Sequence, residues 1–156
     1  MTAAAILQSA RAKGLHIATA ESCTGGLVAA ALTEIPGSSD VFDRGFVTYS
    51  NAAKIAMLGV APQTLDTFGA VSEPVAAEMA TGALARSLAQ IAVAITGIAG
   101  PGGSEFKPEG RVCFGLAETG QSPFSETIDF GPLGRAAVRA KATDHALNLL
   151  LRATRR

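Results

Sequence analysis

A serine and a cysteine stand side by side in the segment ATAESCTGGL, residues 18–27. The hydroxyl of Ser22 and the thiol of Cys23 can each attack a carbonyl carbon once a neighbouring base removes the proton. A thiolate at a helix start is the better nucleophile, but the papain-like mechanism that uses one also needs a histidine partner. We therefore expect Ser22 to be the nucleophile, with Cys23 as the alternative.

The same segment marks the passage from a strand to a helix. Residues 15–19 read as a strand and residues 25–34 as a helix, which places the turn at the carboxyl edge of a sheet, where open α/β sheets bind ligands. Free N–H groups and the dipole of the helix start can bind a phosphate or an oxyanion. We expect Thr24, Gly25 and Gly26 to contribute to such a site. An N-cap at Thr24 followed by an ordinary glycine turn is the alternative interpretation.

Two further polar segments lie at the ends of predicted strands. Residues 48–54 contain Tyr49, the only tyrosine of the chain, and Lys54, one turn into a predicted helix. In the alternative interpretation, Tyr49 is a core aromatic residue and Lys54 is a solvated residue on the helix surface. Residues 96–104 follow the apolar run 91–95 and include four glycines, which suits a loop whose backbone wraps a ligand. This loop has neither the Walker lysine nor the spacing of a dinucleotide-binding fingerprint.

Helices and strands alternate along the chain, which predicts a three-layer α/β/α sandwich with a mixed, mainly parallel sheet. The antiparallel part comes from a hairpin near the C-terminus. Residues 62–68 read as a loop or a single turn, and the length fits one domain over residues 1–156. We expect helices over 3–13, 25–34, 52–58 (after a cap at Asn51), 73–88 and 135–152, and strands over 15–19, 42–50, 91–95, 111–117 and 124–130.

Composition excludes several classes of protein. The chain is 48% apolar and 17% charged with a formal net charge of zero, which argues against a disordered chain and against general nucleic-acid binding. We find no apolar run of the roughly 18 to 20 residues that span a bilayer, and we expect no cleavable leader. Cys23 and Cys113 have neither zinc-site nor disulfide spacing. We expect a soluble cytoplasmic protein without nucleic-acid or membrane partners.

Basic side chains gather near the C-terminus. Residues 131–156 carry six Lys or Arg against one acid, Asp144. We expect most of these basic side chains to lie on a solvated helix face. Arg135 and Arg139 differ, because their i, i+4 spacing sets two guanidinium groups on one helix face, an arrangement suited to a phosphate.

These motifs, in this order, resemble the C-terminal domain of the competence/damage-inducible protein CinA. Characterised members of that family are nicotinamide-nucleotide amidases, so the resemblance implies hydrolysis of nicotinamide mononucleotide to nicotinate mononucleotide and ammonia, with no metal or organic cofactor. The longer CinA proteins add an N-terminal domain similar to molybdopterin-binding proteins, and we expect this chain to be the stand-alone amidase form. The resemblance covers nearly the whole chain and rests on AESCTGG (20–26), residues 36–60, GAVSEPVA (69–76), AITGIAGPGG (94–103) and KPEGRV (107–112).

The resemblance also implies the residues of the site. Family members use a serine nucleophile with a lysine and a tyrosine, and these match Ser22, Lys54 and Tyr49. The two histidines lie inside predicted elements, His16 in the first strand and His145 in the last helix, and neither is an obvious base. A serine and lysine pair is the known alternative to a histidine triad.

A lysine base must be neutral at the working pH. Its pKa must then fall from about 10.4 to near 7, which corresponds to roughly 5 kcal/mol. Burial of the amine can produce a shift of this size. Tyr49 would relay the proton or hold the lysine, and N–H groups within 23–26 would form the oxyanion hole.

Substrate contacts are implied in the loop around Thr96 and on the final helix. The motif on that helix is loose and leaves Arg135 and Arg139 open as the phosphate ligand, of which we expect Arg139. The other expected substrate-binding residues come from the glycine-rich segments: Thr24, Gly25, Gly26, Gly97, Gly100 and Gly102. The expected partner is a small nucleotide substrate, and the alanine-rich helices favour a homo-oligomer.

Two other functions stay open. The glycine loops could bind a nucleotide phosphate without catalysis, with Ser22 donating only a hydrogen bond; ammonia release would separate this from an amidase. The family name also fits an interaction domain in DNA uptake or damage response. Neutral charge and the lack of an aromatic and basic stripe argue against direct DNA contact.

Overall fold

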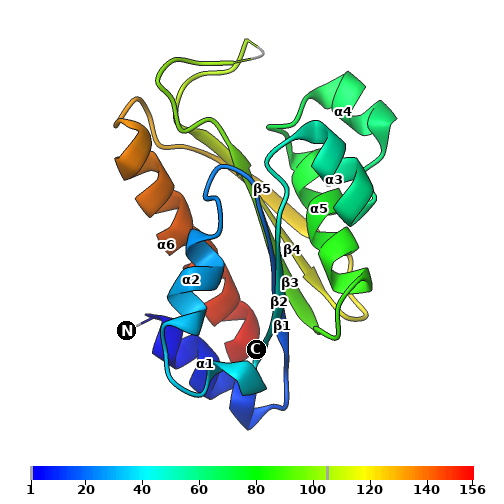
Figure 1. The fold of residues 1–156 in the computed structure, drawn as a ribbon, viewed down its shortest axis with the longest axis vertical. Helices are drawn as coiled ribbons and strands as arrows, with labels where there is room; N and C mark the ends of the chain where they lie inside the picture. The colour runs from blue at the N-terminus through cyan, green and yellow to red at the C-terminus, as the bar shows by residue number, and fades with distance from the viewer. Residues whose placement is uncertain (1, 105) are drawn as a thin grey trace.

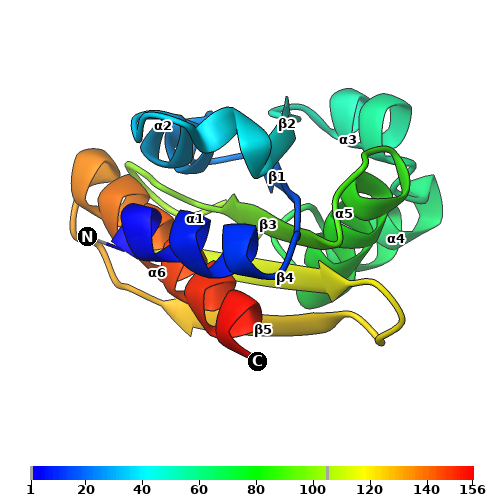
Figure 2. The ribbon, with the colours of Figure 1, turned by 90° about the horizontal axis from the view of Figure 1, so that it is seen from below.

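A five-stranded sheet lies between two groups of helices (Figure 1, Figure 2). The computed structural model describes residues 2–104 and 106–156. The strands are β1 (Ile17–Glu21), β2 (Phe42–Val47), β3 (Ile91–Gly97), β4 (Arg111–Glu118) and β5 (Phe124–Asp129). The helices are α1 (Thr2–Ala12), α2 (Leu27–Thr33), α3 (Asn51–Leu58), α4 (Pro62–Phe68), α5 (Glu73–Ala85) and α6 (Arg135–Arg155), with a short 3-10 helix η1 (Ser38–Asp40). Helices α1, α2 and α6 cover one face, and α3, α4 and α5 cover the other.

The strand order is β2-β1-β3-β4-β5. Strand β1 pairs in parallel with β2 and with β3, whereas β4 is antiparallel to both β3 and β5. Four of the five strands therefore run in one direction. This confirms the predicted three-layer sandwich with a mixed, mainly parallel sheet, and it brings the carboxyl ends of β1, β2 and β3 to one edge.

Side chains of β1 alternate between two hydrophobic cores. Ile17 packs with α1, α2 and α6, whereas Ala18 and Ala20 pack with α3, α4 and α5. Continuing the alternation turns Glu21 toward α2 and Ser22 toward α3. The side chains of these two consecutive residues thus lie on opposite faces of the sheet.

Close packing of two helices seats the helix that carries Lys54. A Cβ at Gly82 of α5 would overlap the carbonyl oxygen of Leu58 at the end of α3. Only glycine lets the two backbones approach so closely. In the described part of the chain, no helix has both the length and the apolarity to cross a membrane.

Helix α4 corrects the expectation of a loop or single turn over 62–68. The backbone N–H of Ala61 and the hydroxyl of Thr64 donate to the carboxylate of Glu78, at 2.8 and 2.6 Å. Leu65 is buried against the core. Contacts with α5, distant in sequence, therefore stabilise a helix that the local sequence marks weakly.

The limits of the strands also differ from the expected ones. Strand β1 runs from Ile17 to Glu21, so His16 lies just before the strand and not within it. Its carbonyl accepts from the N–H groups of Gln90 and Ile91 at 3.0 and 3.3 Å. Pairing with β2 and β3 on both sides carries β1 two residues beyond the predicted end.

Candidate active site

A cavity of about 310 Å³ opens at the carboxyl edge of the sheet. Its walls come from the segments that follow β1, β2 and β3, from the start of α6, and from Ala70 and Val71 before α5. The edge is the one where the sequence predicts a site. The polar or charged side chains on the lining are those of Ser22, Cys23, Tyr49, Asn51, Lys54, Thr96, Ser104 and Arg135.

Lys54 and Ser22 meet inside this cavity, although they are 32 residues apart in the chain. The Lys54 Nζ atom donates to Ser22 Oγ at 3.0 Å and to the carbonyl oxygen of Thr48 at 2.8 Å. The Lys54 residue is 1% exposed and Ser22 is 8% exposed. An amine within hydrogen-bond reach of a hydroxyl can act as its base when the amine is neutral.

The start of α3 places Lys54. Ser50, not Asn51 as expected, is the N-cap, and its side chain accepts from the N–H of Ala53 at 3.0 Å. Lys54 follows one turn into the helix. Asn51 instead lines the cavity. The sequence did not indicate this position, because Asn51 was expected to cap the helix.

Glu21 occupies the start of α2, where the sequence predicts a site for a bound anion. Its carboxylate accepts from the hydroxyl of Thr24 at 2.6 Å and from the N–H groups of Val28 and Ala29, both at 3.0 Å. The N-cap is Gly26, with a φ of 110°, and not Thr24. An acidic residue shortly before a helix start is the signal that could have indicated this contact.

The thiol of Cys23 is buried beside Ser22. Burial, as the main cause, raises the pKa of Cys23 to about 11. The thiol therefore stays protonated at neutral pH and is a poor nucleophile there. A Cβ at Gly97 would lie 3.1 Å from the Cys23 sulfur and 2.8 Å from a methyl group of Val112, so this contact needs glycine.

The two arginines of α6 occupy different positions. Arg135 lines the cavity and donates from Nη1 to the carbonyl oxygen of Gly100 and from Nη2 to the hydroxyl of Tyr49, both at 2.8 Å. Arg139 donates from Nε to the carbonyl oxygen of Cys23 at 3.1 Å. Arg139, the expected phosphate ligand, thus contacts the backbone of the turn between β1 and α2, whereas Arg135 faces the cavity.

Two side chains of the segment between β3 and β4 form hydrogen bonds to the backbone just before α5, on another wall of the cavity. The hydroxyl of Thr96 donates to the carbonyl oxygen of Ala70 at 2.9 Å. The Lys107 amine donates to the carbonyl oxygens of Phe68 and Val71, both at 2.6 Å. These contacts hold the glycine-rich backbone of 97–103 over the cavity.

Neither histidine lines the cavity. The His145 ring, on α6, is 2.5 Å from the Glu126 carboxylate and packs against Phe114 with ring centroids 4.4 Å apart. Its position agrees with the structural role expected for it.

The sequence model of the CinA C-terminal domain matches residues 1–154. The chain belongs to the CinA C-terminal domain family. It is 53% identical to "Nicotinamide-nucleotide amidohydrolase PncC" of Escherichia coli K12 over 144 residues, which cover 92% of this chain and 87% of the relative. It is 52% identical over 147 residues to a "CinA-like protein" of Chlorobium phaeobacteroides, covering 92% of this chain and 35% of that protein. The chain thus spans about a third of the length of such CinA-like relatives.

Solved structures agree with this membership of the CinA family. A competence/damage-inducible protein from Agrobacterium tumefaciens is 50% identical with a TM-score of 0.95, covering 99% of this chain and 94% of that one. A CinA superfamily protein from Escherichia coli is 40% identical with a TM-score of 0.93, covering 97% and 88%. Among the described residues of the present CinA domain, no cluster of three His, Cys, Asp or Glu could hold a metal ion.

Proposed function

We propose that this chain is a nicotinamide-nucleotide amidase, which hydrolyses nicotinamide mononucleotide to nicotinate mononucleotide and ammonia. The observation that carries the proposal is the 3.0 Å contact between Lys54 Nζ and Ser22 Oγ on the wall of a cavity. The identity to the Escherichia coli amidohydrolase supports the choice of substrate.

Lys54 serves as the base in the proposed first step. Burial disfavours an ammonium ion, and the Thr48 carbonyl oxygen orients the amine by accepting from it at 2.8 Å. In the reactive state the hydrogen bond to Ser22 reverses, so that the hydroxyl donates to the neutral amine. The Ser22 oxygen then attacks the carboxamide carbon while its proton passes to Lys54.

The carboxamide oxygen becomes an oxyanion when the tetrahedral intermediate forms. The N–H of Cys23, the residue after the nucleophile, is the proposed donor to it. Lys54 next gives its proton to the amide nitrogen, and the C–N bond breaks to release ammonia. The remaining nicotinoyl ester on Ser22 is hydrolysed by a water molecule that Lys54 deprotonates, which frees the carboxylate product and restores the serine hydroxyl.

The cavity also suits the rest of the substrate. Ala70 and Val71 supply an apolar wall for a pyridine ring, and the loop 97–103 supplies backbone groups without bulky side chains. We assign the phosphate to Arg135, because its guanidinium faces the cavity while Arg139 contacts the nucleophile turn. A guanidinium binds a phosphate through charge-assisted hydrogen bonds.

Ammonia release from nicotinamide mononucleotide by the purified chain tests the proposal. Wild type is expected to release ammonia, and Ser22→Ala to lower turnover by about three or more orders of magnitude without unfolding. Cys23→Ala is the matched control and should keep most activity. Nucleotide binding without ammonia release would show a binding module, and loss of activity in Cys23→Ala alone would move the nucleophile to Cys23.

The proposal includes the state of the protein in the cell. We expect no nucleic-acid partner, because the chain has no net charge. We expect a homo-oligomer, because the helices are rich in alanine. We also expect one domain, a cytoplasmic location and no membrane partner. Light scattering of the purified chain and fractionation of cells measure the assembly and the location.

A further inference from the structure

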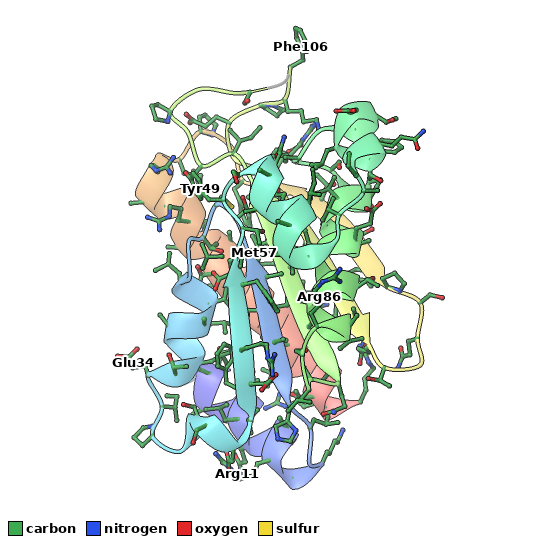
Figure 3. All side chains as sticks on the ribbon, turned by 45° about the vertical axis from the view of Figure 1, so that its right-hand side comes forward. Arg11, Glu34, Tyr49, Met57, Arg86 and Phe106 are labelled. Atoms are coloured by element: carbon green, nitrogen blue, oxygen red, sulfur yellow. The ribbon has the colours of Figure 1, made fainter. Side chains whose placement is uncertain are left out.

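Arg139 contacts the turn after β1 from the face of the sheet opposite to Lys54. Helices α2 and α6 pack side by side on that face (Figure 1). In Figure 3 the labelled Tyr49 lies beside the start of α6, and Arg139 follows one turn along this helix. Its Nε atom donates to the carbonyl oxygen of Cys23 at 3.1 Å, whereas Lys54 reaches Ser22 from α3. Two basic side chains on opposite faces thus contact consecutive residues.

The backbone of this turn leaves room for the guanidinium. A Cβ atom at Gly25 would lie 3.3 Å from Nη2 of Arg139. Gly25 also has a φ of 58°, in the left-handed region that other residues rarely adopt. Glycine at this position therefore lets the Arg139 side chain lie against the turn, with no other side chain between them.

The contact fixes the second of the two peptide groups that flank Cys23. The first is held through the carbonyl oxygen of Ser22, which accepts from the N–H of Gly25 at 3.0 Å. The second is held through the carbonyl oxygen that accepts from Arg139. Because each peptide group is planar, fixing both oxygens also fixes the direction of the Cys23 N–H.

The N–H of Cys23 has the properties of a donor to a ligand. None of the hydrogen bonds between the described residues engages it, although Cys23 is 5% exposed and lines the cavity. Buried backbone N–H groups are nearly always paired, so an unengaged one at a cavity wall indicates a ligand acceptor. In amide hydrolysis that acceptor is the carboxamide oxygen, which gains negative charge in the tetrahedral intermediate.

We propose that Arg139 is a positioning residue of the amidase. By holding the carbonyl oxygen of Cys23, it keeps the Cys23 N–H and the Ser22 hydroxyl aligned for attack on the carboxamide. This inference rests on the proposed amidase function. It replaces the phosphate contact expected from the sequence, because Arg139 binds the backbone of the turn and does not line the cavity. Loss of its guanidinium should slow the chemical step and leave substrate binding in place.

Steady-state kinetics of Arg139→Met test this role. Methionine keeps an apolar stem on α6 and has no donor for the Cys23 carbonyl oxygen. For nicotinamide mononucleotide, kcat should fall roughly 10- to 100-fold, because a misplacement of about 1 Å can cost 100-fold. KM should stay within about threefold of wild type. Nicotinamide riboside, which lacks the phosphate, should show the same loss of kcat.

Two further variants separate positioning from other effects of the substitution. Arg139→Lys retains the charge and a donor for a carbonyl oxygen, so its kcat should lie closer to wild type than that of Arg139→Met. Arg152→Met removes an exposed guanidinium near the other end of α6 and is the matched control, with unchanged kinetics. A rise in KM for the mononucleotide alone would make Arg139 a phosphate ligand and overturn the inference. Wild-type kcat in Arg139→Met would overturn it as well.

Labelling with a fluorophosphonate tests the positioning without the nucleotide. This reagent phosphonylates an activated serine with loss of fluoride and the hydroxyl proton, and its phosphoryl oxygen takes the place of the oxyanion. Mass spectrometry should show Ser22 labelled in wild type, no label in Ser22→Ala, and labelling about tenfold slower or more in Arg139→Met. Labelled wild type that releases no ammonia from the mononucleotide would refute the proposed substrate and keep the inference. Equal labelling rates in wild type and Arg139→Met, or no labelling of wild type, would refute the inference.

Discussion

Glu21 and Ser22 are neighbours at the end of β1, yet their surroundings are opposite. Glu21 turns toward α2, where three donors within 3.0 Å satisfy its carboxylate. Ser22 turns toward α3, where its oxygen meets the amine of Lys54 at the wall of a cavity. One side of the strand end is closed by its own hydrogen bonds, and the other is open to a ligand.

The difference shows how buried polar groups divide between stability and chemistry. A buried carboxylate with charge-assisted hydrogen bonds at a helix start stabilises the fold. A buried amine is costly to keep charged, and a base is useful only where a substrate can reach it. Substitutions on the two sides should therefore have opposite profiles of stability and activity.

Lys54→Met should have the largest effect of these substitutions on activity. Turnover of nicotinamide mononucleotide is expected to fall roughly 10²- to 10⁴-fold, because the proposed general base is lost. The free energy of unfolding should change little, since the lost hydrogen bond to Thr48 is offset by removal of a buried amine. Ammonia release and urea unfolding measure the two quantities. Lys141→Met, at an exposed position of α6, is the control, and near-normal turnover in Lys54→Met would remove Lys54 from the mechanism.

Glu21→Ala should have the reverse profile. It leaves the N–H groups of Val28 and Ala29 and the hydroxyl of Thr24 without their acceptor, which should lower the free energy of unfolding by about 1 to 3 kcal/mol. The folded protein should lose less turnover than Lys54→Met loses. Glu34→Ala, exposed at the other end of α2, should change stability by less than about 0.5 kcal/mol. Equal stability of the two alanine variants would show that Glu21 does not stabilise the helix start.

The last expected effect concerns the thiol of Cys23, beside Ser22. With a pKa of about 11, Cys23 carries about 100-fold less thiolate at pH 8 than an ordinary thiol. Alkylation of Cys23 in a Cys113→Ala background should therefore be at least that much slower in the native than in the unfolded chain. The native rate should rise about tenfold per pH unit up to pH 10, because the thiolate is the reacting form. Rapid labelling of the native chain at pH 7 would restore Cys23 as a rival nucleophile.

Local patterns in the sequence determined the alternation of strands and helices, the three-layer sandwich and the edge of the sheet that holds the site. These follow from hydrophobic period, caps and turn residues, which depend on neighbours along the chain. The proximity of Ser22 and Lys54 could also be predicted from the sequence. Both residues follow strands that end at this edge, and the resemblance to the CinA domain named them as partners.

Only the tertiary structure decided which groups fill the space at that edge. It assigned the start of α2 to Glu21, turned Arg135 and not Arg139 into the cavity, and made a helix of residues 62–68. Each outcome depends on contacts between segments that are distant in sequence or on the direction of a single side chain. Residue type and spacing do not specify such contacts, because the packing of the whole sheet and its helices sets the distances.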